Sequence, residues 1–231
     1  MKYALITGSS SGIGKAIALK LSKEGYFIFI TYKDNVEGAN RTLELVKETS
    51  DGKVIQFDLM SSTSIEQCFT EVKDVTKSLD VLVNNAGVTE DLVNYFSASF
   101  DDIAQVVNTN ITGTFFLTQK LIPLLKGAKA SFIINIGSIK GEIAGSSTIV
   151  YGATKSALIN FTKTLSKVLP SNIKVEILNL GYVKTERYGS FSKESLDNML
   201  AKIPTHQFTT PEEVAEEVMK KLSSLFERVP S

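Results

Sequence analysis

The stretch TGSSSGIG at residues 7–14 decides the fold of this chain. It follows the apolar run KYALIT (2–7) and precedes a helical pattern over 13–24. The glycines Gly8, Gly12 and Gly14 allow a tight turn and a close approach of the backbone to a phosphate group. The N–H groups that begin the following helix offer positive partial charge to an anion. This unit predicts an α/β fold with an anion-binding first β–α junction.

Short apolar runs alternate with helical patterns along the rest of the chain. Strands are predicted at 2–7, 26–31, 53–58, 80–85, 131–137 and 174–180, and helices at 13–24, 36–49, 62–77, 100–126, 149–169, 193–202 and 211–227. The strands are apolar along most of their length, as in a parallel sheet that is covered on both faces. We therefore expect one Rossmann-type, doubly wound domain over residues 1–231, with about six strands and helices on both faces.

The composition argues against several classes of protein. Lys+Arg and Asp+Glu both number 25, and a net charge of zero argues against nucleic acid or an anionic membrane as the main partner. No apolar run is long enough to span a membrane, and the N-terminus lacks a signal-peptide design. The one cysteine, Cys68, permits no disulfide framework or Cys/His zinc spacing. We expect a cytoplasmic protein without a metal site.

The segment YGATK places Tyr151 and Lys155 four residues apart on a predicted helix. Residues at this spacing share one helix face, and an ammonium beside a phenol favours the phenolate. Ser138 precedes Tyr151 by thirteen residues, at the carboxyl end of a strand, where ligands bind in such folds. A Y-x-x-x-K pair is common by chance, so its interpretation as an acid/base pair depends on the rest of the chain.

A second interpretation of the glycine turn is a hydrolase. GSSSG (8–12) also matches G-x-S-x-G, the nucleophile elbow of α/β-hydrolases. Ser10 would be the nucleophile, Asp197 the acid and His206 the base, in the appropriate chain order. That elbow normally follows several strands, whereas this turn follows the first. The hydrolase interpretation also leaves Gly14 and the Tyr151/Lys155 pair unexplained. We therefore favour the interpretation of the turn as a dinucleotide-binding site.

Several motifs in fixed order resemble those of the short-chain dehydrogenase/reductase family. They are TGSSSGIG, Asp58, NNAG (84–87), Asn110, Ser138, Tyr151 with Lys155, and NLGYVKT (179–185). The resemblance runs from about residue 2 to about residue 222. Within the family, the chain is most similar to the 3-oxoacyl-[acyl-carrier-protein] reductases. The resemblance implies an NAD(P)-dependent oxidoreductase that transfers hydride to a carbonyl group.

The resemblance also implies catalytic roles. Hydride transfer to a ketone builds negative charge on oxygen, which requires a proton donor close by. Tyr151 would donate the proton, and Lys155 would lower its pKa and bind the nicotinamide ribose. Ser138 would hold the substrate oxygen. Asn110 would brace a proton-relay water behind Lys155.

A cofactor site along the sheet edge is implied in the same way. Asp58 with the Leu59 N–H would hold the adenine, and Ala86-Gly87 would leave room for the adenosine ribose. Val183 and Thr185 would hold the carboxamide, and Asn84 is expected to be structural. The expected cofactor-binding residues are Gly8, Ser9, Ser11, Gly12, Ile13, Gly14, Thr31, Lys33, Asp58, Leu59, Asn85, Ala86, Gly87, Tyr151, Lys155, Gly181, Val183 and Thr185.

The end of the second strand favours NADP(H). A carboxylate there normally binds the ribose 2′-OH of NAD and would repel a 2′-phosphate. This strand ends in Thr31-Tyr32-Lys33, without an acid. Lys33 could pair with the phosphate, and Thr31 and Ser9 could donate hydrogen bonds to it. Asp34 follows directly, so NAD(H) stays possible.

Two departures from the family pattern affect the turn after the sixth strand and the oligomer. Leu180-Gly181 replaces the usual Pro-Gly, which loosens the turn but removes no contact. Family members usually add a last strand and a glycine-rich end that helps to build a tetramer, whereas this chain ends in SSLFERVPS. We therefore expect the last family strand to be missing and leave the tetramer open. A homodimer through the apolar faces of 100–126 and 149–169 is expected.

The substrate is the least determined part of this interpretation. Residues 186–206 should cap the site with Tyr188, Phe191, Leu196 and Met199, opposite a wall at 87–96. These apolar groups suit a small-molecule or carrier-bound acyl substrate, and a 3-oxoacyl thioester is our first expectation. Alternatives are a sugar, a polyol or a natural-product ketone, or a non-catalytic dinucleotide-binding sensor. Four surface lysines could bind an acidic carrier protein, or they could simply be solvated. They are Lys126, Lys129, Lys163 and Lys167.

Overall fold

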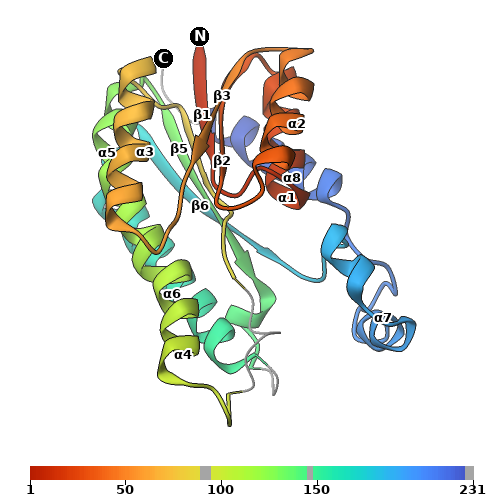
Figure 1. Ribbon diagram of the computed structural model, residues 1–231. Coiled ribbons are helices and arrows are strands. Elements are labelled where there is room, and N and C mark those ends of the chain that lie inside the picture. The colour runs from red at the N-terminus through yellow and green to blue at the C-terminus, as the bar shows by residue number, and fades with distance from the viewer. Residues whose placement is uncertain (89–94, 145–147, 227–231) are drawn as a thin grey trace.

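A six-stranded parallel sheet crosses the computed structural model, which describes residues 1–88, 95–144 and 148–226 (Figure 1). Its strands are β1 (Lys2–Ile6), β2 (Tyr26–Tyr32), β3 (Gly52–Gln56), β4 (Val81–Asn84), β5 (Ser131–Ser138) and β6 (Ile173–Leu180). Their order is β3-β2-β1-β4-β5-β6, and every neighbouring pair is parallel. The chain reverses its direction of growth between β1 and β4, which is where ligands bind in such sheets. The predicted Rossmann-type fold is confirmed.

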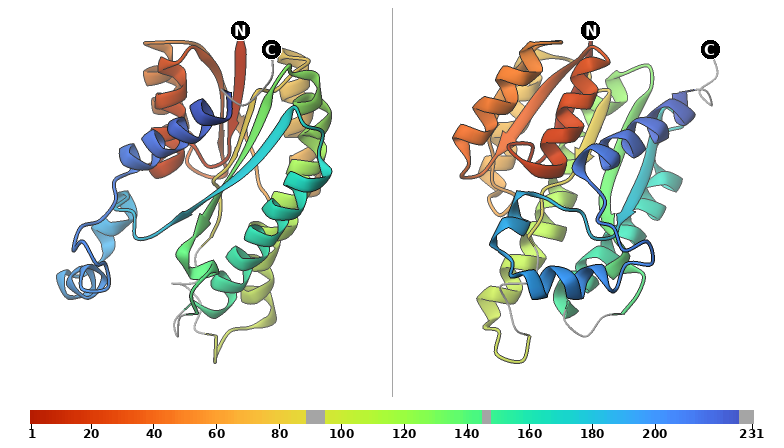
Figure 2. Two further views of the ribbon diagram at one scale, coloured as in Figure 1. Left: turned by 180° about the vertical axis from the view of Figure 1, so that it is seen from behind. Right: turned by 90° about the vertical axis from the view of Figure 1, so that its right-hand side faces the viewer.

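Helices cover both faces of the sheet (Figure 2). They are α1 (Gly12–Lys23), α2 (Val36–Lys47), α3 (Ser62–Val75), α4 (Phe100–Val107), α5 (Thr114–Gly127), α6 (Ile149–Val168), α7 (Lys193–Leu200) and α8 (Pro211–Phe226). One apolar core joins the sheet to α1, α2 and α8, and a second joins it to α3, α5 and α6. The strands are continuously apolar because each face contacts one of these cores.

The central strands show how the two cores divide the side chains. Ile6 and Ile28 point to the α1 side, whereas Leu5 and Phe29 point to the α3 side, and all four are fully buried. Each such burial contributes about 1.5–3 kcal/mol of transfer free energy. The alternation along paired strands fixes the register, because a slip by one residue would exchange the two faces.

The predicted helix over 100–126 is wrong in one respect: it is not uniform. A π-helical segment, Asn108–Gly113, lies between α4 and α5. Gly113 sits so close to the Leu59 carbonyl that a Cβ atom would overlap it. This wider turn is a feature often found at functional sites, and here it holds Asn110, whose side chain is buried. Single-sequence periodicity cannot reveal such an extra residue in a turn.

The sheet has no strand beyond β6 within the described ranges. Instead, Val183 forms an isolated parallel bridge with Thr209, and α8 packs against α1. An ion pair of 2.6 Å between Lys20 and Glu216 joins these two helices. Residues 89–94 of the expected substrate wall at 87–96 lie outside the described residues. In the described part of the chain, every helix is too short or too polar to cross a bilayer.

Candidate active site

The glycine turn between β1 and α1 has a backbone that only glycine adopts easily. Gly8 and Gly12 have φ angles of 66° and 53°, in the left-handed region. A Cβ atom on Gly14 would overlap the Gly8 carbonyl oxygen and would lie 2.7 Å from Nδ2 of Asn85. The spacing of the three glycines is therefore required by the turn itself.

The first turn of α1 is open to an anion. Its N-cap, Ser11, makes no side-chain cap hydrogen bond, and the first turn contains no acidic residue. The initial N–H groups of a helix have no intrahelical partner, and the helix dipole favours negative charge there. Gly12 faces Thr185, whose Cγ2 lies 3.3 Å from a Cβ built on Gly12. The donors of this turn therefore fit the pyrophosphate of a dinucleotide.

Thr7 ties the glycine turn to the NNAG segment, and sequence reasoning missed this residue. Its hydroxyl oxygen accepts hydrogen bonds from the N–H groups of Asn85 and Ala86, both at 2.9 Å. The same hydroxyl donates to the Val83 carbonyl at 3.3 Å, and Asn85 Nδ2 donates to the Thr7 carbonyl at 2.8 Å. The signal in the sequence that could have identified Thr7 was a hydroxyl residue directly after the first strand, β1, whose end lies beside the end of β4.

Two cavities open along the carboxyl ends of the strands and share Gly87. The larger, of about 280 Å³, is lined by Ile13, Asn85, Gly87, Ile136, Gly137, Ser138, Ile139, Lys140, Thr148, Tyr151, Lys155, Leu180, Gly181, Tyr182, Val183, Thr185, Tyr188, Phe191 and Met199. The smaller, of about 180 Å³, is lined by Gly8, Thr31, Tyr32, Lys33, Phe57, Asp58, Leu59, Ala86, Gly87, Val88, Gln105 and Thr109. Two adjoining cavities beside a helix N-terminus fit the two halves of a dinucleotide.

Most of the predicted cofactor-binding residues line one of these cavities, but four do not. Ser9, Ser11, Gly12 and Gly14 belong to the glycine turn and are not among the residues lining either cavity. Their contribution is the backbone geometry of the turn and its N–H groups.

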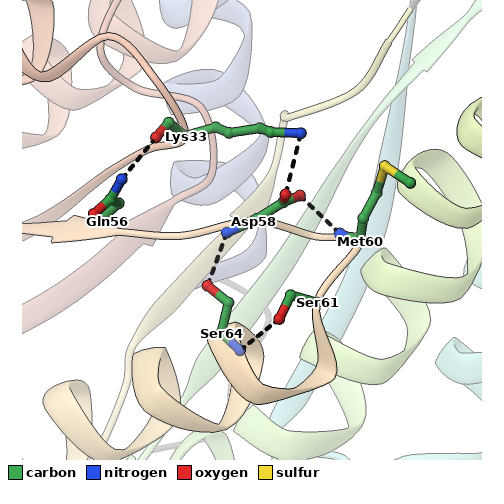
Figure 3. A network of polar contacts seen from close by, with 6 residues as sticks. All are labelled: Lys33, Gln56, Asp58, Met60, Ser61 and Ser64. Carbon is green, nitrogen blue, oxygen red and sulfur yellow. Dashed lines mark hydrogen bonds and ion pairs between the residues drawn. The ribbon is translucent and has the colours of Figure 1, made fainter.

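The smaller cavity holds an ion pair between Lys33 and Asp58, whose Nζ and Oδ2 atoms are 3.1 Å apart (Figure 3). Oδ1 of Asp58 accepts a hydrogen bond from the Met60 N–H at 2.9 Å, and the Asp58 N–H donates to Ser64 Oγ at 3.0 Å. Gln56 Nε2 donates to the Lys33 carbonyl at 3.2 Å. The carboxylate is thus fixed from two sides, whereas the lysine head is half-exposed.

The expectation that Thr31 and Ser9 donate hydrogen bonds to a 2′-phosphate needs correction. Both residues are fully buried, and both hydroxyls donate to the Ile6 carbonyl, at 3.3 and 2.8 Å. The hydroxyl oxygens accept from the N–H groups of Gly8 and Thr31, at 3.1 and 3.0 Å. The two side chains therefore hold the glycine turn against β2, because their protons are already committed.

Tyr151 and Lys155 share one face of α6, as predicted, and both line the larger cavity. Lys155 Nζ donates to the Ile136 carbonyl at 2.9 Å and lies 5.6 Å from the centroid of the Tyr151 ring. The lysine side chain is buried, and this burial lowers its pKa from 10.5 to about 8. Near neutral pH the ammonium is the main form, but its proton is held much less tightly than that of an ordinary lysine.

Ser138 ends β5, as predicted, and is paired in register with Leu180 of β6. Its hydroxyl oxygen accepts a hydrogen bond from the Lys140 N–H at 3.2 Å and caps a 3₁₀ turn, Ile139–Gly141. A serine hydroxyl has one proton and two lone pairs, so this bond leaves the proton available to a ligand in the cavity.

Asn110 does not line either cavity; its side chain braces the chain beside them. Oδ1 accepts from the Val88 N–H and Nδ2 donates to the Val88 carbonyl, both at 2.9 Å. Nδ2 also donates to Thr154 Oγ1 at 3.2 Å, next to Lys155 in α6. A Cβ on Gly87 would lie 3.0 Å from Asn110 Oδ1. Asn110 thus connects the π-helical segment to the loop that follows β4 and to α6, the helix that carries Lys155.

Asn84 lies in a buried polar network, consistent with a structural side chain. Its Nδ2 donates to Asn135 Oδ1 at 2.8 Å and to Thr118 Oγ1 at 3.0 Å. Asn135 Nδ2 donates in turn to Thr162 Oγ1 at 2.8 Å. The network joins β4 and β5 to α5 and α6, and it holds the ends of the two strands that carry the site.

The residues after β6 close the larger cavity. Gly181, Val183 and Thr185, which are predicted to bind the cofactor, line it together with Leu180 and Tyr182. From the predicted cap, Tyr188, Phe191 and Met199 line the cavity, whereas Leu196 is not among the lining residues. The Tyr188 ring packs edge-on against Phe191 and Phe208, with centroids 5.3 and 5.2 Å apart. Sequence reasoning missed Lys140 and Thr148, which also line this cavity.

The three residues of the hydrolase interpretation do not form a hydrogen-bonded triad in the described part of the chain. Ser10 lies in the glycine turn, and Asp197 and His206 are exposed on α7 and on the loop that follows it. Within the described ranges, no hydrogen bond links any two of the three. A triad needs its members within hydrogen-bond reach, so this arrangement does not support a hydrolase.

Comparisons with a family model, with curated proteins and with solved structures all point to the same protein family. The family model for short chain dehydrogenase matches residues 2–195. The 3-oxoacyl-[acyl-carrier-protein] reductase FabG of Aquifex aeolicus is 35% identical over 227 residues, covering 97% of this chain and 91% of that protein. The RhlG/NADP active-site complex of Pseudomonas aeruginosa has a TM-score of 0.88 at 30% identity and covers 94% of this chain and 88% of its own.

A third similar protein is a short chain dehydrogenase from Burkholderia cenocepacia, solved in complex with NADP. It has a TM-score of 0.86 at 27% identity and covers 94% of this chain and 88% of its own. Fold, site geometry and relatives agree, and the hydrolase and the non-catalytic sensor are no longer needed to explain the motifs. The chain belongs to the short-chain dehydrogenase/reductase family and is an NAD(P)-dependent oxidoreductase acting on a C=O or CH–OH group.

Proposed function

We propose that this protein is an NADPH-dependent ketoreductase whose substrate is a 3-oxoacyl thioester, free or bound to an acyl carrier. The observation that carries the proposal is that Ser138, Tyr151 and Lys155 line one cavity of about 280 Å³. The same cavity reaches Ile13, in the first turn of α1, so the reacting groups adjoin the anion-binding turn.

The chemistry that a bound, reduced nicotinamide cofactor would supply is a hydride, from its C4 to the carbonyl carbon of the substrate. The Ser138 hydroxyl donates a hydrogen bond to the carbonyl oxygen and orients it. As negative charge grows on that oxygen, Tyr151 transfers its phenolic proton there, which completes the alcohol. The cation of Lys155 stabilises the phenolate that Tyr151 then carries.

Lys155 also suits the return of a proton to Tyr151. Burial lowers its pKa to about 8, so the ammonium gives up and regains a proton within the physiological range. The Ile136 carbonyl, which accepts from Nζ at 2.9 Å, holds the ammonium in place. Asn110 contributes as a positioning residue, through Thr154 on the helix that carries Lys155.

The preference for NADP(H) rests on Lys33. Its half-exposed ammonium lines the smaller cavity, and β2 itself ends in Thr31-Tyr32, without the acidic residue that normally binds a ribose 2′-OH. An ammonium there would attract a 2′-phosphate. Asp58 and Leu59, which line the same cavity, would hold the adenine.

The thioester class rests on the apolar cap and on the relatives. Tyr188, Phe191 and Met199 form a mostly apolar wall that suits an acyl chain. The name of the A. aeolicus relative states that it reduces a 3-oxoacyl group on an acyl carrier protein. We also propose a cytoplasmic location, a reducing compartment in which a free, buried cysteine such as Cys68 is ordinary.

For the assembly, we propose a homodimer through α4, α5 and α6. Phe100, Ile149 and Val168 on these helices are 84%, 39% and 69% exposed, and the rings of Phe115 and Phe161 stack 3.8 Å apart on α5 and α6. Contiguous apolar patches mark interaction surfaces, and we infer that these helices form one between two copies of the chain. Light scattering after size exclusion should give twice the chain mass, and Val168→Arg, at a residue that is 69% exposed, should give the monomer; a monomeric wild type would refute the dimer.

The substrate proposal is tested by initial rates with NADPH and a panel of ketones. The panel contains 3-oxoacyl thioesters, keto sugars, oxidised polyols and aromatic polyketide ketones. We expect kcat/KM to be highest for the thioesters and higher with NADPH than with NADH. A larger kcat/KM for another ketone class would replace the thioester as the substrate but leave the oxidoreductase intact.

A further inference from the structure

Lys140 lines the larger cavity, and the proposed reaction gives it no role. It lies in the 3₁₀ turn Ile139–Gly141, two residues after Ser138. The backbone of this turn is held firmly. The Lys140 N–H donates to Ser138 Oγ at 3.2 Å, and the Gly141 carbonyl accepts from Ser156 Oγ at 2.6 Å.

The same turn packs closely against α6. A Cβ on Gly152 would lie 2.9 Å from the Lys140 carbonyl oxygen, and a Cβ on Gly141 would lie 2.7 Å from the Lys155 carbonyl carbon. The backbone of Lys140 is therefore fixed against α6, the helix that carries Tyr151 and Lys155. Only its side-chain torsions are left to place the ammonium.

The ammonium of Lys140 lies beside an aromatic ring of the cavity, and no acidic side chain in the described part of the chain pairs with it. Its Nζ is 5.8 Å from the centroid of Tyr182, which also lines the cavity. Among residues 1–88, 95–144 and 148–226, no acidic side chain forms an ion pair with it. Glu142, the nearest acid in sequence, accepts from Asn179 Nδ2 at 2.5 Å.

The cavity wall as a whole carries positive charge. Its charged lining residues are Lys140 and Lys155, and no acidic residue of the described chain lines it. Lys155 is committed to the Ile136 carbonyl and, in the proposed reaction, to Tyr151. The cation–π contact of Lys140 is a weak one that an ion pair can replace. A cation held in a partly enclosed, positive cavity suits an anionic ligand.

We propose that Lys140 binds an anionic group, a phosphate or a carboxylate, on the ketone substrate and so determines specificity. This inference rests on the proposed ketoreductase activity and names the substrate class more closely. The phosphate could belong to a phosphopantetheine arm that carries the thioester. The carboxylate could stand at the far end of the acyl group.

The test uses pairs of substrates that differ only in the anion. One pair is acetoacetyl-pantetheine and its 4′-phosphate; the other is the N-acetylcysteamine thioester of a 3-oxo acid ending in a methyl or in a carboxylate. The enzymes are the wild type, Lys140→Met, Lys140→Arg and, as a control, Lys73→Met, which removes an exposed lysine of α3 whose Nζ lies 5.9 Å from the centroid of the Phe69 ring. Steady-state kcat and KM are measured with saturating NADPH.

We expect Lys140→Met to raise KM for the anionic member of one pair by about tenfold to a hundredfold, the range of one charge-assisted hydrogen bond. The neutral member should change less than about twofold, and Lys140→Arg should keep most of the preference. If KM rises for the phosphorylated substrate, Lys140 binds the phosphate of the carrier arm. If KM rises for the carboxylated substrate, Lys140 binds the far end of the acyl group.

Three results would overturn the inference. The first is an equal rise in KM for both members of a pair, and the second is an unchanged KM for every anionic substrate. The third is weaker binding of NADP⁺ to Lys140→Met, which would assign the lysine to the cofactor. If the wild type reduces no thioester, the proposed function fails by itself. Calorimetric titration of the NADP⁺ complexes with 4′-phosphopantetheine, pantetheine and glutarate then decides on Lys140, because only an anion that binds the wild type better than Lys140→Met supports it.

Discussion

Lys33 Nζ and Asp58 Oδ2 lie 3.1 Å apart, so the cation at the end of β2 is paired with the carboxylate that follows β3 (Figure 3). The lysine and aspartate side chains are 51% and 32% exposed. A pair this exposed is worth about 0–1 kcal/mol, so a 2′-phosphate can share or replace the carboxylate at little cost. The pair keeps Lys33 over the cavity before the cofactor arrives.

Lys33→Met should weaken the binding of NADP⁺ and leave the binding of NAD⁺ nearly unchanged. Loss of one charge-assisted contact to phosphate corresponds to an increase in Kd of about tenfold or more. Fluorescence titration of both nucleotides measures it. Lys53→Met is the matched control, since Lys53 pairs with Glu71 at 3.0 Å with similar exposure. An equal loss for NAD⁺ and NADP⁺ would contradict the role of Lys33.

Lys155→Met should stabilise the free protein near neutral pH and lose this advantage as the pH rises. The folded pKa of Lys155 is about 8, below its ordinary value of 10.5, so the unfolded chain binds more protons between these values. The stability of the wild type therefore gains from rising pH in that window. The variant should be more stable by up to about 3 kcal/mol below pH 8.

Urea unfolding of both proteins at pH 7, 8, 9 and 10 measures this difference. Cys68 and Tyr26 have pKa values that burial raises to about 12, so they lower stability at high pH. Their contribution is the same in both proteins and cancels in the comparison. A difference in unfolding free energy that stays constant from pH 7 to 10 would show that burial of the ammonium is not what the variant relieves.

Thr7→Val should loosen the contact between the glycine turn and the NNAG segment. The change leaves the N–H groups of Asn85 and Ala86 without their shared acceptor, at a cost of about 1–3 kcal/mol. We expect a lower free energy of unfolding and weaker NADP⁺ binding. Thr70→Val is the control, because its hydroxyl only donates to the Glu66 carbonyl on the exposed face of α3. Unchanged nucleotide affinity would mean that Thr7 does not help to shape the site.

Gly14→Ala should destabilise the first β–α junction, because its methyl group would overlap the Gly8 carbonyl. Overpacking of this kind costs about 1–3 kcal/mol. Gly189→Ala serves as control, since a Cβ there has no neighbour within 4 Å. Equal unfolding midpoints for the two variants would show that the turn has room for a side chain.

Much of the fold could be predicted from periodicity and the glycine turn. The strands that carry Leu5, Phe29 and Ile133 are buried on both faces, so their apolar runs were a strong signal. Ser138 and Tyr151 fell where predicted because both sit at the ends of regular elements. What could not be predicted depends on contacts distant in sequence.

The π-helical segment is one such case, because it follows from the packing of Gly113 on Leu59. The inward hydroxyl of Thr31 is another, since its partner, the Ile6 carbonyl, lies on a neighbouring strand. Lys140 resembled any loop lysine in the sequence. Its place in the cavity wall follows from the packing of the 3₁₀ turn on α6.

The most direct test compares Tyr151→Phe with the wild type in the NADPH-dependent reduction of a 3-oxoacyl thioester, with the NADP⁺ affinity of both measured by titration. Loss of a positioned general acid costs about 10²- to 10⁴-fold in rate. The account predicts a fall of kcat in that range with a nucleotide Kd within about twofold of the wild type. A variant that retains the wild-type kcat would contradict the assignment of Tyr151 as the proton donor.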